Sequence, residues 1–114
     1  MTMKSNVLDL PLKKEWYNMI ESGEKTEEYR EIKPYWIKRL TELKTDTLPF
    51  SMRNRYQPIP FKKYDYVRFR YGYTSRTMEL KIEEITWGQG KAEWGAPAAS
   101  VFIIKLGERI WPAW

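Results

Sequence analysis

The chain has 114 residues, a net charge of +5 and 16% aromatic residues, which suits one folded domain. It contains no cysteine and no histidine, which excludes disulfides, thiol chemistry, imidazole metal sites and serine-histidine catalytic pairs. No stretch approaches the roughly 20 apolar residues that span a bilayer, and the first residues lack the apolar run of a secretory signal. We therefore expect a cytoplasmic protein that makes no membrane contact and needs no metal or other cofactor.

The N-terminal segment predicts a strand followed by a helix. The strand covers 6–10 and ends at Pro11, because proline cannot donate a hydrogen bond to a sheet. The helix covers about 13–22, and its apolar face follows the spacing of Leu12, Trp16, Met19 and Ile20. Glycine directly after this pattern is typical of a helix C-terminus.

The next segment predicts an extended stretch, a second helix and a long loop. Residues 26–32 alternate as a strand would, and Pro34 suits the first turn of a helix over 34–44. Residues 45–63 contain three prolines and the cations Arg53 and Arg55, which indicates a long basic loop.

The C-terminal half predicts three strands. In the strand that ends at 71, apolar residues occupy one parity, whereas Tyr66, Arg68 and Arg70 occupy the other. In the strand over 78–87, the inward row starts at Met78 and reaches Glu84 by simple alternation. The last strand, 100–106, is apolar on both parities, which is typical of a strand covered on both sides. Glycines and a proline mark the connection over 88–97 as irregular.

This order of elements predicts a single α+β domain over 1–114. We expect a small, mostly antiparallel β-barrel with two main helices packed on it. The spacing of Trp16, Trp36 and Phe69 assigns them to the core and not to a ligand. Trp87 and Trp94 flank glycines in the irregular connection and are candidates for stacking on a base.

The densest charge cluster follows the first helix, in SGEKTEEYRE at 22–31. In an extended segment Glu28 and Arg30 are neighbours on one face, and Lys25 joins them from a turn that Gly23 permits. Four glutamates surround Lys25 in sequence, and close carboxylates favour its protonated form, so we expect a fixed cation. The purely structural alternative is an ion pair that braces the junction of helix and strand.

The run Gly23-Glu24-Lys25-Thr26-Glu27-Glu28-Tyr29-Arg30 resembles the G-x-K-x-x-E-x-R signature of the ASCH domains, relatives of the PUA domain. The resemblance implies a PUA-like barrel and RNA or a nucleotide as partner. It further implies a cleft lined by the glycine, lysine, glutamate and arginine of the motif. Some similar small members are enzymes that act on N4-acetylcytidine or on RNA.

Two main functions remain open from the sequence, with a protein-interaction adaptor as a third. The first is an RNA- or nucleotide-binding module, and the second is a small hydrolase in which Lys25, Glu28 and Glu84 act as acid-base groups. The predicted ligand-binding residues are Gly23, Lys25, Thr26, Glu28, Arg30, Arg53, Arg55, Tyr66, Arg68 and Arg70. Tyrosines beside arginines suit base stacking together with phosphate contact. The sequence assigns no oligomeric state.

Overall fold

The structure, a computed structural model, describes residues 6–112. Its elements in chain order are β1 (Val7–Leu12), α1 (Lys14–Glu21), β2 (Glu27–Glu31), α2 (Pro34–Leu40), α3 (Phe50–Arg53), β3 (Tyr66–Tyr71), β4 (Thr77–Gly88), the 3-10 turn η1 (Ala92–Trp94) and β5 (Val101–Trp111). The α+β class and the two main helices of the sequence prediction are confirmed.

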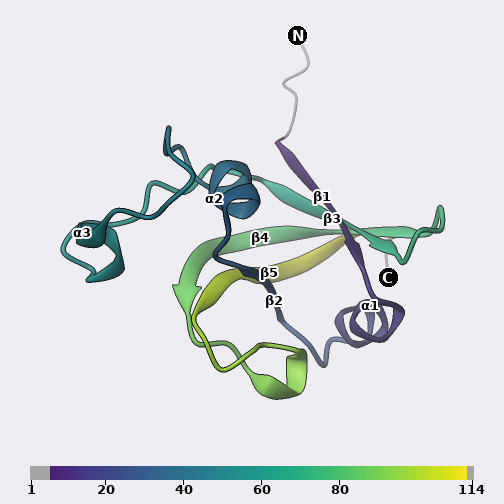
Figure 1. Cartoon of the computed structure of the whole chain (residues 1–114). Helices are drawn as coiled ribbons and strands as arrows, with labels where there is room; N and C mark the ends of the chain where they lie inside the picture. Colours follow the sequence, from purple (N-terminus) through teal and green to yellow (C-terminus); the bar gives the residue numbers. More distant parts are fainter. Residues whose placement is uncertain (1–5, 113–114) are drawn as a thin grey trace, which may run out of the picture.

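The five strands form one mixed sheet in the order β1-β3-β4-β5-β2. β1 and β3 are parallel and the other three pairings are antiparallel. The sheet curls into half a barrel, with α1 and α2 packed against it (Figure 1). Within residues 6–112, β1 and β2 do not pair with each other, so both keep a free edge. These two edges form the seam of the half-barrel.

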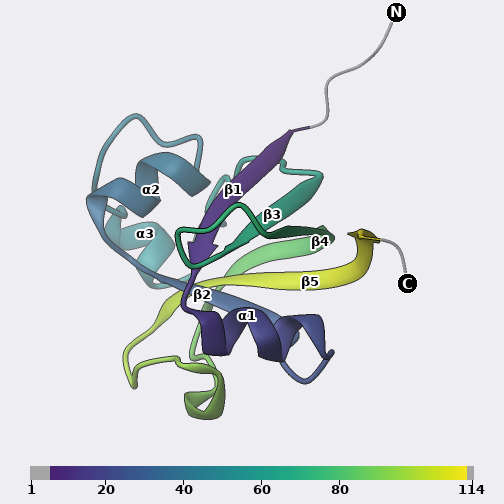
Figure 2. The same ribbon diagram turned by 90° about the vertical axis from the view of Figure 1, so that its right-hand side faces the viewer.

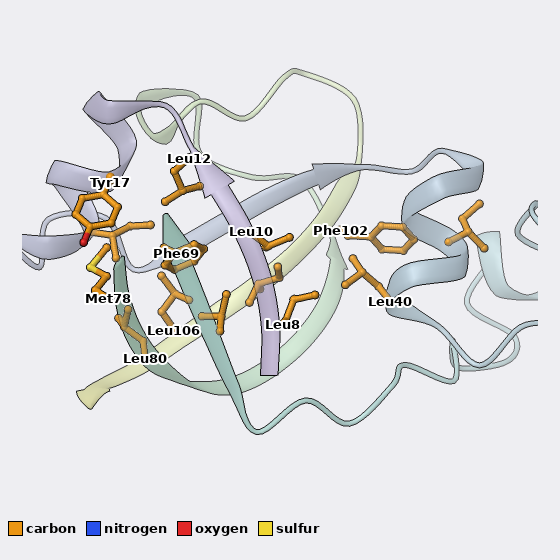
Figure 3. Packing of buried hydrophobic residues seen from close by; sticks show 14 of the residues in the cluster. Leu8, Leu10, Leu12, Tyr17, Leu40, Phe69, Met78, Leu80, Phe102 and Leu106 are labelled. Atoms are coloured by element: carbon orange, nitrogen blue, oxygen red, sulfur yellow. The ribbon is translucent and has the colours of Figure 1, made fainter. Parts of the chain in front are cut away.

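The main core fills the inner side of the curl. Leu10 of β1, Phe69 of β3 and Met78 of β4 are buried there. Figure 3 shows Tyr17 of α1 at one end of this core and Leu40 of α2 at the other. A second, smaller cluster lies on the outer face, where Tyr29, Val101 and Ile103 pack under Trp94 and Ala96 of the loop that carries η1.

Several element ends differ from the sequence prediction for local reasons. β1 continues through Pro11, which an edge strand tolerates because proline lacks only a donor. α2 ends at Leu40 and not at residue 44, because Thr41 is extended and pairs with Phe61. The loop predicted over 45–63 contains the short helix α3. β5 runs five residues beyond its predicted end, and the last two residues of the chain lie outside the described part.

A β-bulge changes the side-chain alternation in β4. Ile82 is opposite Leu106, but Glu84 is opposite Lys105, so two steps on β4 match one step on β5. The bulge moves Ile85 and Trp87 to the inner side, where they pack against the core. The prediction that Glu84 takes the inward place is therefore wrong, and this side chain is exposed on the outer face.

The buried face of α1 is also shifted from its prediction. Leu12 belongs to β1 and not to the helix, so an apolar spacing that starts at Leu12 has the wrong phase. Tyr17 and Ile20 are the buried residues of α1, whereas Trp16 is only half-buried. Trp36 is half-buried too, and Phe69 is confirmed as a core residue.

Among residues 6–112, no helix is both long enough and apolar enough to cross a membrane.

Candidate functional site: a cleft at the seam

A cleft of about 730 Å³ lies between the two free edges of the half-barrel. One wall comes from the end of β1 and the start of α1, and the opposite wall comes from β2. The turn between β3 and β4 and the loop that carries η1 complete it. Figure 2 shows the course of the backbone in β1, α1, β2 and β5, with α1 in front. Its lining residues are Pro11, Leu12, Lys13, Trp16, Glu28, Tyr29, Arg30, Glu31, Gly72, Tyr73, Trp94, Gly95, Pro97 and Val101. We call this the seam cleft.

A chain of three charged side chains runs along β2 at this cleft. Lys25 Nζ lies 3.2 Å from Glu28 Oε1, and Arg30 Nη2 lies 3.0 Å from Glu28 Oε2. Glu28 and Arg30 are two residues apart on the strand, so they share its inner face, as the strand parity predicts. The glycine turn is also as expected, because Gly23 has a φ of 86° and follows the end of α1.

The arginine of this chain bridges the seam. Arg30 Nη2 donates a hydrogen bond of 3.2 Å to the carbonyl of Pro11, which belongs to the opposite edge strand. Its guanidinium also lies 5.0 Å from the ring centre of Trp36, within cation-π range. Arg30 therefore holds β2 to β1 where the backbone does not, and part of its side chain faces the cleft.

Lys25 is enclosed beneath the cleft wall. Only 1% of the residue is exposed, and Nζ donates a hydrogen bond of 2.7 Å to the carbonyl of Trp94. The rings of Trp16 and Tyr29 lie 5.4 Å and 4.7 Å from the same nitrogen. The ammonium thus ties the floor of the cleft, through Glu28, to the wall formed by the η1 loop.

Burial sets the acid-base character of Lys25. Desolvation lowers the pKa of Lys25 below its ordinary value of 10.5, and the nearby Glu28 carboxylate offsets part of this shift. The sequence prediction gave the carboxylates the larger effect, and that was wrong because burial outweighs them. Two of the four glutamates that are near Lys25 in sequence have other partners: Glu27 accepts a hydrogen bond from Tyr29, and Glu21 pairs with Arg76.

Tyr29 connects β2 to the η1 loop. Its hydroxyl donates to Glu27 Oε1 at 2.8 Å and accepts from the backbone N–H of Lys91 at 3.1 Å. Burial raises the pKa of Tyr29 above its ordinary 10.0, so the phenol stays protonated at neutral pH. Gly90 packs so closely on Tyr29 that an added Cβ would lie 2.7 Å from the ring. The loop is therefore fitted to this tyrosine.

Aromatic rings line the rest of the cleft. Trp16 and Trp94 are half-buried in its walls, whereas Tyr73, at the tip of the turn between β3 and β4, is 97% exposed. The spacing of Trp16 predicts a core residue, which is wrong, and Tyr73 is not among the residues predicted from the sequence. The available signal was a ring beside a glycine in a turn, as in Gly72-Tyr73 and in Trp94-Gly95.

The other predicted site residues lie outside the cleft. Gly23 and Thr26 are exposed, and Thr26 contributes its carbonyl to the N–H of Leu106. Arg53 and Arg55 lie on and after α3, away from the seam (Figure 1).

One of the two arginines on the predicted basic face of β3 is neutralised by carboxylates. Arg68 pairs with Asp9 at 3.4 Å and with Glu79 at 3.5 Å. Arg70 donates to the carbonyl of Thr74, and Tyr66 is half-buried on the same strand. None of these three β3 side chains lines the seam cleft.

The structure does not assemble the three residues of the hydrolase alternative. Glu84, Lys105 and Glu27 form one cross-strand row, so Glu84 and Glu28 lie on opposite faces of the sheet. Glu84 is exposed and lies 3.8 Å from Lys105. Lys25 and Glu28 thus lie together, whereas Glu84, the third residue of the hydrolase alternative, lies elsewhere. Within residues 6–112, no group of three or more His, Cys, Asp or Glu is placed to hold a metal ion.

Comparisons of this chain with models of known protein families, with curated protein sequences and with solved structures found no match.

Proposed function

We propose that this protein is a binding module for RNA or a nucleotide, and that the seam cleft is its binding site. The observation that carries the proposal is the joint lining of one cleft by the rings of Trp16, Tyr73 and Trp94 and by the guanidinium of Arg30. At about 730 Å³ the cleft falls within the roughly 300–1,000 Å³ that is usual for small-ligand sites.

The lining fits the chemistry of a nucleotide. A base has two flat faces that stack on aromatic rings, and its phosphate carries negative charge. Tyr73 and the two tryptophans supply the rings, and Lys13 and Arg30 supply cations at the same cleft. Glu28 has lone pairs beyond its two ion pairs, so it can accept an N–H from a base edge. A neutral apolar ligand would make no use of these cations.

Lys25 has a positioning role in this proposal. Its ammonium is used by Glu28 and by the carbonyl of Trp94, and it is not among the lining residues. It keeps the Glu28 carboxylate and the η1 loop in place, so that the ligand meets an ordered wall. This role replaces the direct ligand contact that the sequence predicts for Lys25.

We further propose that the chain is an ASCH-like member of the PUA-like group. Support comes from three motif positions: the glycine makes the turn after α1, and the glutamate and arginine line the cleft. The resemblance also implies that Gly23 and Lys25 line the cleft, and they do not. A curled, mainly antiparallel sheet is compatible with a PUA-like barrel.

Binding is tested by titrating labelled single-stranded RNA and cytidine monophosphate at low and at physiological salt. We expect salt-sensitive RNA binding, because phosphate contacts release counterions. Tyr73→Ala should weaken both ligands by about fivefold or more, since stacking on one ring contributes about 1–3 kcal/mol per base. Tyr73 is exposed, so its removal leaves the fold intact.

The control is Trp111→Ala, which removes another exposed ring from the far end of β5. It should leave both affinities unchanged. The proposal is rejected if neither ligand binds at low salt, or if Tyr73→Ala and Arg30→Lys bind as tightly as the wild-type protein.

A further inference from the structure

A second surface, separate from the cleft, combines exposed aromatic rings with basic side chains. Residues 43–60 extend from the body as an arm that carries α3 (Figure 1). A bridge between Thr41 and Phe61 closes the neck of this arm, and the N–H of Glu42 donates to the carbonyl of Pro60 at 2.8 Å. The arm is therefore a defined excursion of the chain with its two ends held together.

The arm is braced by contacts with the main core and by hydrogen bonds within the arm. Leu48 and Ile59 are buried against the main core, and Arg53 Nε donates to the carbonyl of Leu48 at 3.1 Å. The hydroxyl of Ser51 donates to Gln57 Oε1 at 2.8 Å, which links α3 to the segment that returns to the body. Side chains on this scaffold are presented without a large ordering cost upon binding.

Two aromatic rings project from this scaffold into solvent. Phe50 is 75% exposed and Tyr56 is 80% exposed, although several neighbouring apolar residues are buried. Between them in sequence, Arg55 adopts a φ of 62°, and its guanidinium lies 4.2 Å from the ring centre of Trp87. Arg55 also donates to the carbonyl of Trp87 at 3.2 Å, so it ties the arm to the end of β4.

Positive charge exceeds negative charge on this arm and its neck. Residues 44–63 hold five basic side chains and one acidic side chain. None of the five basic side chains forms an ion pair within the part of the chain that the structure describes: Lys44, Arg53, Arg55, Lys62 and Lys63. Lys62 and Lys63 line a hollow of about 420 Å³ at the neck.

We infer that the arm is a second contact surface for single-stranded nucleic acid, in which Phe50 and Tyr56 stack on bases and the unpaired cations contact phosphates. The inference rests on the proposed function for its choice of ligand, but it uses a surface separate from the seam cleft. Exposed rings beside uncompensated cations match the two parts of a nucleotide strand. Lysine, which this surface contributes through Lys44, Lys62 and Lys63, is instead depleted in protein-protein contacts.

The test compares binding of a short and a long oligonucleotide, of about 4 and about 16 nucleotides, to the wild-type protein and to Phe50→Ala/Tyr56→Ala. Both RNA and DNA versions are titrated by fluorescence anisotropy. The double variant should bind the long strand about 25-fold more weakly or worse, because it lacks both stacking rings of the arm and each contributes about 1–3 kcal/mol. Its affinity for cytidine monophosphate should stay unchanged, because that ligand occupies the cleft alone.

Charge is tested separately with Lys44→Ala/Lys63→Ala, since both side chains are exposed and neither braces the arm. The slope of the logarithm of affinity against the logarithm of salt concentration should fall by about 0.7 for each phosphate that the variant no longer neutralises. Lys81→Ala, an exposed lysine of β4, is the matched control and should leave the slope unchanged.

Different results would overturn the arm inference and the cleft proposal. If Tyr73→Ala weakens the long strand while both arm variants bind it normally, the arm inference is overturned and the cleft function stands. If the arm variants weaken it and Tyr73→Ala does not, the arm is supported, and the cleft proposal is overturned as well if Tyr73→Ala and Arg30→Lys also bind cytidine monophosphate as tightly as the wild-type protein. A self-associated species that disappears in Phe50→Ala/Tyr56→Ala, with unchanged affinity for the long strand, would make the arm a protein contact. If the arm variants lose the same affinity for RNA and for DNA, the arm acts through stacking and phosphate contact. If they lose affinity for RNA alone, the arm also contacts the 2′-hydroxyl.

Discussion

At the scale of single residues, the buried charge of Lys25 is the feature on which the site depends most. Lys25→Met keeps the volume of the side chain but leaves Glu28 with one cation and the carbonyl of Trp94 without its donor. Breaking a buried ion pair destabilises a protein by about 3–5 kcal/mol, and the remaining contact with Arg30 argues for the lower end, about 3 kcal/mol. Urea unfolding near neutral pH measures this destabilisation.

The matched control is Lys33→Met. Lys33 pairs with Glu31 at 3.1 Å, but both side chains are 63% exposed. Exposed pairs contribute about 0–1 kcal/mol, so this variant should unfold almost as the wild-type protein does. Equal destabilisation of the two variants would contradict the account of Lys25 as a buried structural cation.

The pH dependence of stability gives a second prediction for the same residue. Because burial lowers the pKa of Lys25 from 10.5, the unfolded chain binds more protons than the folded chain between the folded pKa and 10.5. The free energy of unfolding therefore rises with pH in that window. The advantage of the wild-type protein over Lys25→Met should be larger at about pH 10 than at about pH 7.

Urea unfolding of both proteins at several pH values measures this difference. Tyr17, Tyr29 and Tyr64 also have raised pKa values, but they are present in both proteins and largely cancel. An advantage that shrinks as the pH rises would show that the carboxylate, and not burial, dominates the pKa of Lys25.

Strand parity explains why part of the site could be predicted from sequence. Alternation alone makes Glu28 and Arg30 neighbours, and Gly23 indicates the turn that precedes them. The burial of Lys25 could not be predicted, because its cover comes from Trp94, 69 positions further along the chain. Trp16 was misassigned because its helix was phased from a residue that belongs to β1.

At the scale of elements, two local irregularities decide which side chains face the core and how the wall of the cleft is built. The bulge in β4 turns Glu84 away from the inner face, and no rule of simple alternation reveals an inserted residue. The loop that carries η1 depends on two close contacts, of Gly90 with Tyr29 and of Gly95 with Trp16. Strand and helix identities were predictable because long periodic segments set them, whereas bulges and loop packing depend on partners distant in sequence.

Gly95→Ala tests the fit of this loop. Gly95 has a φ of 93°, and an added Cβ would lie 2.9 Å from Cζ2 of Trp16. Gly23→Ala is the matched control, since its φ is 86° but nothing lies within 4 Å of an added Cβ. Both variants carry backbone strain of about 1 kcal/mol. Only Gly95→Ala adds a clash, so it should be clearly less stable in urea unfolding and should also bind cytidine monophosphate more weakly.

The outcome that contradicts this account is an equal decrease of stability in the two glycine variants, together with unchanged nucleotide affinity. It would mean that Trp16 moves aside freely and that the wall of the cleft is not fixed by the η1 loop.

At the scale of the whole molecule, the half-barrel leaves a seam that side chains close. Arg30 reaches from β2 to the carbonyl of Pro11 on β1, and the cleft lies where the two edges stay apart. The charge of the molecule is uneven as well, because residues 44–63, the arm and its neck, carry five basic side chains and one acidic side chain. A single-stranded nucleic acid bound at the cleft and at the arm would therefore contact aromatic rings and cations at both places.

The most direct test of the central claim is a two-dimensional NMR titration of the ¹⁵N-labelled protein with cytidine monophosphate. The indole N–H signals of Trp16 and Trp94 report from the cleft, and that of Trp111 reports from the far end of β5. We predict saturable shifts of the first two signals and of the backbone amides of Tyr73 and Arg30, with Trp111 unmoved. Absence of shifts at these four residues under low salt, or shifts confined to other parts of the chain, would contradict the assignment of the seam cleft as a nucleotide site.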